Sequence, residues 1–252
     1  MGIESVTLTG FEALSLVKGE TLVDTARTLA AMGVNMFIVR HPEVGAPHRV
    51  AEALPGVHVV NAGDGTGEHP TQGLLDLLVL WRRWGGFEGR IVLIVGDVVH
   101  SRVARSNVHG LGAVGAGVVL CGPRPFLPAA EEVPGVVLTE DLDQALGACD
   151  AVMALRIQHE RLADDRQGLD LGAYRDSFGL TAERVARLDP AVPVLHPGPF
   201  NREVEIDSPV VDGIRSLIWP QVRAGVAVRM AVLEALAGSQ VGEPEGESPK
   251  GG

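Results

Sequence analysis

The fold is decided by the stretch Arg90-Ile91-Val92-Leu93-Ile94-Val95-Gly96-Asp97-Val98-Val99-His100-Ser101-Arg102. Its first part, Arg90–Val95, is a short apolar run without polar alternation, which is typical of a strand buried on both faces of a parallel sheet. Gly96 then supplies a turn, and a helix is expected from Ser101. The stretch therefore predicts one strand-turn-helix unit of an α/β protein.

The same alternation of short apolar runs with helix-period segments continues along the chain. The predicted buried strands are Met36–Arg40, Val57–Asn61, Arg90–Val95, Gly117–Cys121, Ala151–Leu155 and Val192–Leu195. The predicted helices are Thr21–Met32, Pro47–Leu54, Thr71–Trp84, Ser101–Val114, Leu142–Ala148 and Thr181–Leu188, with Asp143 and Thr181 as early caps. This order predicts parallel sheets with right-handed crossovers and ligands at their carboxyl edge.

The glycine-rich break Gly85–Gly89 predicts a domain junction, with the preceding helix as the connector. We therefore expect one domain over residues 1–84 and a second over residues 85–218. A last helix, 219–237, carries enough apolar residues to pack on a core, and residues 238–252 are expected to be a disordered tail.

Composition indicates a globular protein of 252 residues, with 46% hydrophobic and 21% charged residues. Abundant glycine (32 residues) and few aromatics (4%) suit an α/β fold better than a β-sandwich. The net charge of −11 argues against a nucleic-acid or anionic-membrane partner. It also means that arginines must be gathered locally if the chain is to capture an anionic substrate.

Sequence features that would direct the chain to or across a membrane are absent. No run approaches the roughly 18 apolar residues of a membrane span, and the amino terminus lacks the basic and apolar regions of a secretory signal. A cytoplasmic location is therefore expected. Cys121 and Cys149 each close a short apolar run and are expected to be buried free thiols.

The first candidate site is His69-Pro70-Thr71-Gln72. Proline suits the first position of a helix, so His69 would lie at the helix mouth and Gln72 in its first turn. Helix amide groups favour negative charge there, and an imidazole could polarise a carbonyl oxygen that gains charge during reaction. A histidine cap beside a solvated glutamine explains the pattern equally well.

Arginines form the rest of the candidate site. Arg102 and Arg105 would lie one turn apart near a helix start, and Arg102 stands where a dinucleotide fold would need the missing Gly-x-Gly-x-x-Gly pattern. Arg156, with Gln158, follows one predicted strand and Arg40 ends another. A guanidinium binds a carboxylate with two hydrogen bonds and so fixes its orientation. Each arginine alone is explained as a surface charge, but their repetition at strand ends favours an anion site.

Other chemistries find little support. The histidines and cysteines lack the spacing of a zinc site, and no metal or cofactor is expected. Neither a Gly-x-Ser-x-Gly nucleophile motif nor a phosphate-binding P-loop is present.

These residues fall within motifs that resemble the catalytic chains of aspartate carbamoyltransferases, in the aspartate/ornithine carbamoyltransferase family. The resemblance covers about Val6 to Leu236. The matching motifs are Lys18–Leu22, Arg40–Pro42, Asn61–Gly65, His69–Gln72, Gly96–Arg102, Leu155–Arg161 and His196–Arg202.

The resemblance implies two doubly wound α/β domains, one for carbamoyl phosphate and one for aspartate, with the last helix packing back on the first domain. It also implies a homotrimer with shared active sites, and a regulatory chain or a dihydroorotase as further partners. The expected roles are as follows: carbamoyl phosphate is held by Arg40, His69 and Gln72, aspartate by Lys18, Arg102, Arg156 and Gln158, and the pocket is lined by backbone carbonyls of Pro197 and Gly198.

The implied reaction is attack of the aspartate amine on the carbamoyl carbon, with loss of phosphate, in pyrimidine biosynthesis. Donors aimed at the oxyanion and at the phosphate would supply the catalysis, with His69, Arg40 and Lys18 as catalytic residues. Phosphate could accept the amine proton, so that no protein base is required.

The chain departs from the family pattern in two places. The phosphate-binding Ser-Thr-Arg-Thr segment does not occur in it, since Thr25-Ala26-Arg27-Thr28 falls inside a predicted helix. We therefore expect a first domain incomplete on its N-terminal side, from a reading frame begun at an internal methionine or from a truncated copy. Leu14 replaces a frequent serine, for which Ser15 could substitute.

Two alternatives remain. An ornithine carbamoyltransferase would place a cationic side chain against Arg156, and its late loop has a cysteine that His196-Pro197-Gly198-Pro199 lacks. A non-catalytic paralogue that supports a pyrimidine-synthesis complex would explain the missing phosphate segment but not the retained arginines.

Overall fold

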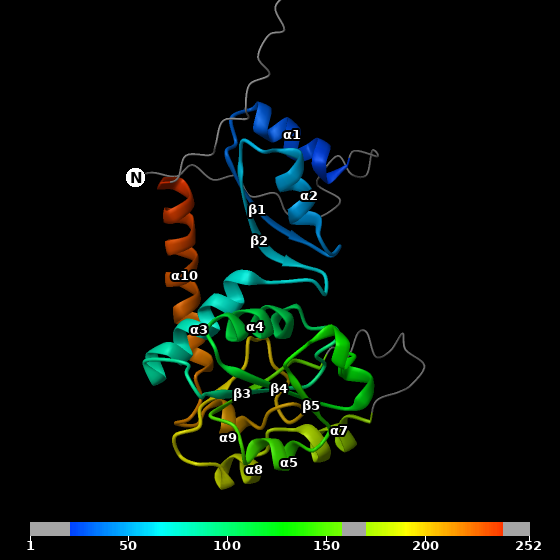
Figure 1. The fold of residues 1–252 in the computed structure, drawn as a ribbon, viewed down its shortest axis with the longest axis vertical. Coiled ribbons are helices and arrows are strands. Elements are labelled where there is room, and N and C mark those ends of the chain that lie inside the picture. The colour runs from blue at the N-terminus through cyan, green and yellow to red at the C-terminus, as the bar shows by residue number, and fades with distance from the viewer. Residues whose placement is uncertain (1–20, 158–169, 239–252) are drawn as a thin grey trace, which may run out of the picture. The chain divides into compact units, whose positions relative to one another are not determined.

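The computed structural model describes residues 21–157 and 170–238 of the chain (Figure 1). The chain divides into two compact units, Met1–Gly65 with Leu233–Gly252, and Thr66–Val232. Each unit has a parallel sheet of its own among the described residues. The predicted α/β fold class is therefore confirmed.

The first unit is built around one crossover between two parallel strands. Its elements are α1 (Leu22–Ala31), β1 (Met36–His41), α2 (Ala46–Ala53) and β2 (His58–Asp64). β1 and β2 pair in parallel with Met36 opposite His58. Thr21 caps α1, because its hydroxyl accepts a hydrogen bond from the amide of Asp24 at 3.1 Å.

The second unit contains a five-stranded parallel sheet in the order β5-β4-β3-β6-β7. The strands are β3 (Ile91–Val95), β4 (Gly117–Cys121), β5 (Val137–Thr139), β6 (Ala151–Ala154) and β7 (Val194–Leu195). From β3 the chain builds outward to β4 and β5, then returns to place β6 on the other side of β3. The carboxyl ends of β3 and β6 therefore flank the switch in strand order, where open α/β sheets bind ligands.

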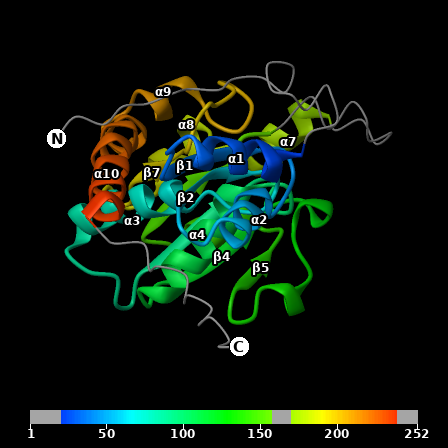
Figure 2. The same ribbon diagram turned by 90° about the horizontal axis from the view of Figure 1, so that it is seen from above.

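Helices cover both faces of this sheet (Figures 1 and 2). One face carries α3 (Pro70–Trp84) and α4 (Arg102–Ala113), and the other carries α5 (Leu142–Leu146), α7 (Leu171–Phe178), α8 (Ala182–Arg187) and α9 (Ser208–Val211). The last helix, α10, spans Ile218–Gly238. None of the described helices, α10 included, has both the length and the apolar character needed to cross a membrane.

Alternate residues of the central strands feed two separate cores. Val92 and Ile94 pack with Leu80 of α3 and Leu111 of α4. The intervening Leu93 belongs to the core on the opposite face. This alternation explains why the strand reads as continuously apolar, because neither of its faces meets water.

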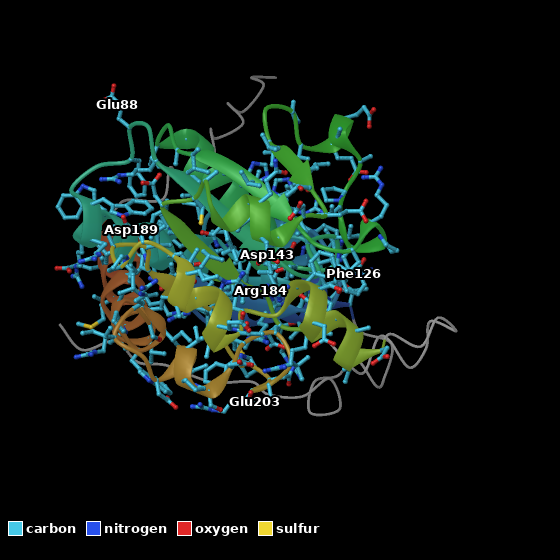
Figure 3. All side chains as sticks on the ribbon, turned by 90° about the horizontal axis from the view of Figure 1, so that it is seen from below. Glu88, Phe126, Asp143, Arg184, Asp189 and Glu203 are labelled. Atoms are coloured by element: carbon cyan, nitrogen blue, oxygen red, sulfur yellow. The ribbon has the colours of Figure 1, made fainter. Side chains whose placement is uncertain are left out.

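Helix starts in the second unit show which predicted caps were right. Thr181 caps α8 by accepting a hydrogen bond from the amide of Arg184 at 3.2 Å, as predicted. The prediction for Asp143 was wrong, because Asp141 caps α5 and accepts from the amide of Gln144 at 2.9 Å. Asp143 lies inside α5 and accepts instead from the guanidinium of Arg184 at 3.1 Å (Figure 3).

The other predicted elements are present with ends shifted by at most three residues. The described elements that sequence reasoning missed are short: β5, α7, α9 and the 3₁₀ helices Arg124–Phe126 and Ala130–Glu132. β5 has three residues and α9 has four, too few for a period to be recognised.

Both cysteines are buried and unpaired, as predicted. Burial raises the pKa of Cys121 to about 12 and that of Cys149 to about 11. Both thiols are therefore protonated at neutral pH.

Gly96 is required where β3 turns toward α4. Its φ is +129°, and a Cβ atom there would lie 3.1 Å from Cβ of Leu155 and 3.3 Å from the hydroxyl of Tyr174. We expect Gly96→Ala to lower the free energy of unfolding by about 1–3 kcal/mol, because it combines backbone strain with crowding.

Gly112→Ala is the matched control for this prediction, since Gly112 lies in α4 and a Cβ atom added to it would meet nothing within 4 Å. It should raise the free energy of unfolding by about 0.5–1 kcal/mol through the greater helix propensity of alanine. Urea unfolding of both variants gives the comparison. Equal stabilities of Gly96→Ala and the wild type would show that the turn tolerates a side chain.

Candidate active site

His69 lies at the start of α3, where the sequence predicted it. It is the N-cap residue and Pro70 is the first helical residue, yet the imidazole makes no capping hydrogen bond. The backbone N–H of His69 donates to the hydroxyl of Ser106 in α4 at 2.8 Å. The start of α3 is therefore fixed against α4 rather than held by a histidine cap.

The imidazole of His69 has Thr71 as a neighbour, with 3.4 Å between Oγ1 and Nδ1. A threonine hydroxyl that donates to Nδ1 leaves the proton of a neutral imidazole on Nε2. An Nε2–H group at a helix N-terminus is a suitable donor to a carbonyl oxygen that becomes negative during reaction.

Gln72 does not fit the alternative of a solvated glutamine. Its side chain is buried, and its Nε2 donates to Oδ1 of Asp76 at 3.0 Å. The amide is therefore held in one orientation within the second unit.

Arg102 begins α4 directly after β3 and the Gly96 turn. Ser101 caps this helix by accepting a hydrogen bond from the amide of Ala104 at 3.1 Å. Arg105, one turn further, is exposed and lines a cavity of about 450 Å³ together with His109. Apart from Arg105, that cavity is lined by none of the predicted site residues, so it does not support the assignment of the others.

Arg156 follows β6 at the carboxyl edge of the sheet, beside the end of β3. It is partly buried, and Ile157 after it is fully buried. The amide nitrogen Nδ2 of Asn201 donates to the carbonyl oxygen of Ile157 at 3.0 Å. This bond ties the Arg156 segment to the loop that follows β7.

The loop after β7 contains Pro197 and Gly198 and is fixed by a buried histidine. Nδ1 of His196 accepts a hydrogen bond from the amide of Gly198 at 2.9 Å. Its Nε2 lies 3.3 Å from Oε1 of Glu205, and both side chains are at most 1% exposed. The buried His196 side chain therefore fixes the backbone of the predicted pocket loop.

Within the second unit, these contacts join the start of α3 to α4 and the segment after β6 to the loop after β7, while β6 pairs with β3. His69, Gln72, Arg102, Arg156, Pro197 and Gly198 all belong to these segments. Their substrate contacts stay predictions.

Arg40 belongs to the first unit, near the carboxyl end of β1, and is exposed. The loop after it is held by Asp64, whose Oδ2 accepts from the amide of Gly45 at 2.7 Å. Gly65 completes this loop, because a Cβ atom there would overlap the carbonyl oxygen of Pro42.

Some of the predictions fall outside the described residues. They concern Lys18 and Gln158 as aspartate ligands, Ser15 as a substitute for the usual loop serine, and the tail beyond residue 238.

Sequence reasoning missed the buried polar side chains behind the site, among them Ser106, Asn107, His196, Glu205 and Gln221. Asp76, which is fully buried, is another of these missed residues. One signal was available: Asp76 lies four residues after Gln72 and next to Leu75, on the apolar face of a predicted helix.

Metal binding finds no support in residues 21–157 and 170–238. No group of three or more His, Cys, Asp or Glu side chains there could hold a metal ion.

Two models of one protein family match most of the chain. The model described as aspartate/ornithine carbamoyltransferase, carbamoyl-P binding domain, matches residues 1–82, and the Asp/Orn binding domain of the same family matches residues 88–236. The chain belongs to the aspartate/ornithine carbamoyltransferase family.

Curated relatives point to one branch of the family. The aspartate carbamoyltransferase catalytic subunit of Myxococcus xanthus is 52% identical over 225 residues, covering 87% of this chain and 73% of the relative. That of Gemmatimonas aurantiaca is 51% identical over 233 residues, covering 92% and 71%.

Solved structures agree with the fold. Aspartate transcarbamoylase from Trypanosoma cruzi, in complex with carbamoyl aspartate and phosphate, is similar with a TM-score of 0.76 at 30% identity, covering 90% of this chain and 73% of that one. Ornithine carbamoyltransferase from Gloeobacter violaceus has a TM-score of 0.72 at 27% identity, covering 87% and 75%. The fold alone thus does not separate the two activities.

Burial of Asp76 makes the free energy of unfolding depend on pH. Desolvation raises its pKa from 3.8 to about 6, although hydrogen bonds from Asn107, Gln221 and Gln72 oppose the rise. The folded chain therefore binds this proton more tightly than the unfolded chain does. The resulting stabilisation is complete below the unfolded pKa and is lost as the pH rises through about 6.

Asp76→Asn removes this titration. Between about pH 5 and about pH 7.5, the wild type should lose roughly 1 kcal/mol of unfolding free energy relative to the variant. Urea unfolding at both pH values measures the difference, in which other titrating groups cancel. A pH-independent difference would show that Asp76 has an ordinary pKa.

Proposed function

We propose that this chain transfers the carbamoyl group of carbamoyl phosphate to the amine of L-aspartate, giving N-carbamoyl-L-aspartate and phosphate, in pyrimidine biosynthesis. The main structural support is the position of Arg156 at the carboxyl end of β6, where the hydrogen bond between Asn201 and Ile157 connects its segment to the loop after β7. Relatives that are 51–52% identical to this chain are named aspartate carbamoyltransferase catalytic subunit, and this supports the proposal.

In the proposed site, each residue has a role that suits its position. Arg102 and Arg156, with Lys18 and Gln158, hold the two carboxylates of aspartate and orient its amine. Arg40, His69 and Gln72 hold carbamoyl phosphate, with Nε2–H of His69 directed at the carbonyl oxygen.

The amine then attacks the carbamoyl carbon, and its oxygen takes up negative charge. Donation by His69 and the arginines stabilises this oxyanion and the departing phosphate. The phosphate accepts the proton that the amine loses, so the step balances without a protein base.

Aspartate is favoured over ornithine as the second substrate. A guanidinium at position 156 matches a side-chain carboxylate and repels the ammonium group of ornithine. A homotrimer, a regulatory chain or dihydroorotase partner, and a cytoplasmic location remain predictions.

We expect Arg156→Ala to lower kcat/KM for aspartate by about 100-fold or more, because it removes a charged, two-bond contact with a carboxylate. The KM for carbamoyl phosphate should change far less. The kcat/KM of Arg156→Lys for aspartate should lie between those of the wild type and Arg156→Ala, since lysine keeps the positive charge but cannot donate two parallel hydrogen bonds to a carboxylate. The assay is formation of carbamoyl aspartate by the 252-residue chain, with ornithine as competitor.

Arg90→Ala is the matched control, since Arg90 precedes β3 at the opposite edge of the same sheet and pairs with Asp150 at 2.8 Å. It should leave kcat/KM unchanged. Preferred use of ornithine, or equal losses in Arg90→Ala and Arg156→Ala, would contradict the proposed function. A wild-type chain without any turnover would favour the non-catalytic paralogue instead.

A further inference from the structure

Asp76 is a buried carboxylate to which the reaction assigns no role. It lies in α3, one helical turn after Gln72, and is 0% exposed. A buried carboxylate is costly unless it is fully hydrogen-bonded, so its retention calls for a reason.

Three side-chain amides from three helices donate to this carboxylate. Oδ1 accepts from Nε2 of Gln72 in α3 at 3.0 Å and from Nε2 of Gln221 in α10 at 2.7 Å. Oδ2 accepts from Nδ2 of Asn107 in α4 at 2.8 Å. An ionised carboxylate can only accept, so it forces each amide to turn its nitrogen inward.

We propose that Asp76 is a positioning residue that orients the Gln72 amide so that Oε1 is the atom available to the substrate. This inference rests on the proposed function. Carbamoyl phosphate has one strong hydrogen-bond donor, its NH₂ group, and needs an acceptor for it. With Nε2 turned toward Asp76, the Gln72 side chain presents its acceptor, Oε1, on the opposite side of the amide.

The same carboxylate also reaches the loop after β7. Oε1 of Gln221 accepts from the backbone N–H of His196 at 3.0 Å, while Nε2 of the same amide is held by Asp76. His196 in turn accepts from the amide of Gly198. The bond to His196 thus fixes the Gln221 amide independently of Asp76, and Gln72 is the amide whose orientation depends on the carboxylate.

A neutral asparagine of the same shape cannot satisfy this arrangement. In Asp76→Asn, a side chain that kept its oxygen toward Gln72 and Gln221 would place its NH₂ against the NH₂ of Asn107. If it turned its NH₂ toward them, both glutamines would have to turn over, and Gln221 would present a nitrogen to the N–H of His196. The negative charge, rather than the shape, selects the orientation.

The test uses two ligands that differ at the group in question. N-(phosphonacetyl)-L-aspartate joins the phosphonate and aspartate parts but lacks the carbamoyl NH₂. Asp76→Asn should lower kcat/KM for carbamoyl phosphate by about 10-fold or more, the loss of roughly one hydrogen bond to the substrate. The Kd of the analogue should change by less than about 3-fold, since no contact with that NH₂ is at stake.

A double-mutant cycle separates positioning from a merely structural role. Gln72→Met removes the amide but keeps the volume, and it should cause the same selective loss as Asp76→Asn. Combining the two should cost no more than about 2-fold beyond Gln72→Met alone, because Asp76 acts through Gln72. Thermal melting checks that each variant folds. Asp76→Ser, whose hydroxyl also fails to fix the amide, replaces Asp76→Asn if that variant does not fold.

The outcomes separate the two proposals. A wild-type chain that forms no carbamoyl aspartate overturns the proposed function and the positioning role together. An active wild type with unchanged kinetics in Asp76→Asn overturns the positioning role alone. Equal losses of turnover and analogue affinity, or additive effects in the cycle, also overturn it, because they mark a general packing defect.

Discussion

The arrangement of the candidate site depends on the parallel pairing of β3, β6 and β7. Because the strands run in one direction, the segments that follow them leave the sheet at one edge, although they are far apart in sequence. Gly96, Arg156 and His196 come directly or almost directly after these strands. Burial on both faces fixes the register of the strands. The packing of the two cores therefore also determines where the arginines after the strands lie.

Behind the carboxyl edge of this sheet, the second unit buries polar side chains at positions where apolar side chains would cost less free energy. Asp76 is buried yet bonded to three side-chain amides, and the buried side chains of His196 and Glu205 each accept a hydrogen bond from a backbone N–H group. Such contacts contribute little net stability, but they allow only one orientation of each amide and ring. This specificity is what a site needs if it must tell a carbamoyl NH₂ from other groups of similar size.

Most of the fold could be predicted from the sequence, because short, continuous apolar runs such as Ile91–Val95 alternate with long segments of helical period. β5 and α9 could not be located, because three and four residues are too few to show a repeating pattern. The cap of α5 was misplaced by two residues, from Asp141 to Asp143, because both positions carry an acid that suits a helix start. For the site, motifs pointed to His69, Gln72 and Arg156. Gln221 was beyond reach, since its partner Asp76 lies in a helix 145 residues away.

The state of Cys121 and Cys149 has a practical consequence. The chain has two cysteines, both buried, and burial keeps their sulfurs in the unreactive thiol form. A cysteine engineered at an exposed position would therefore react with a maleimide dye far faster than either native one. Single-site fluorescent labelling, and with it distance measurements across the molecule, needs no prior removal of native sulfur.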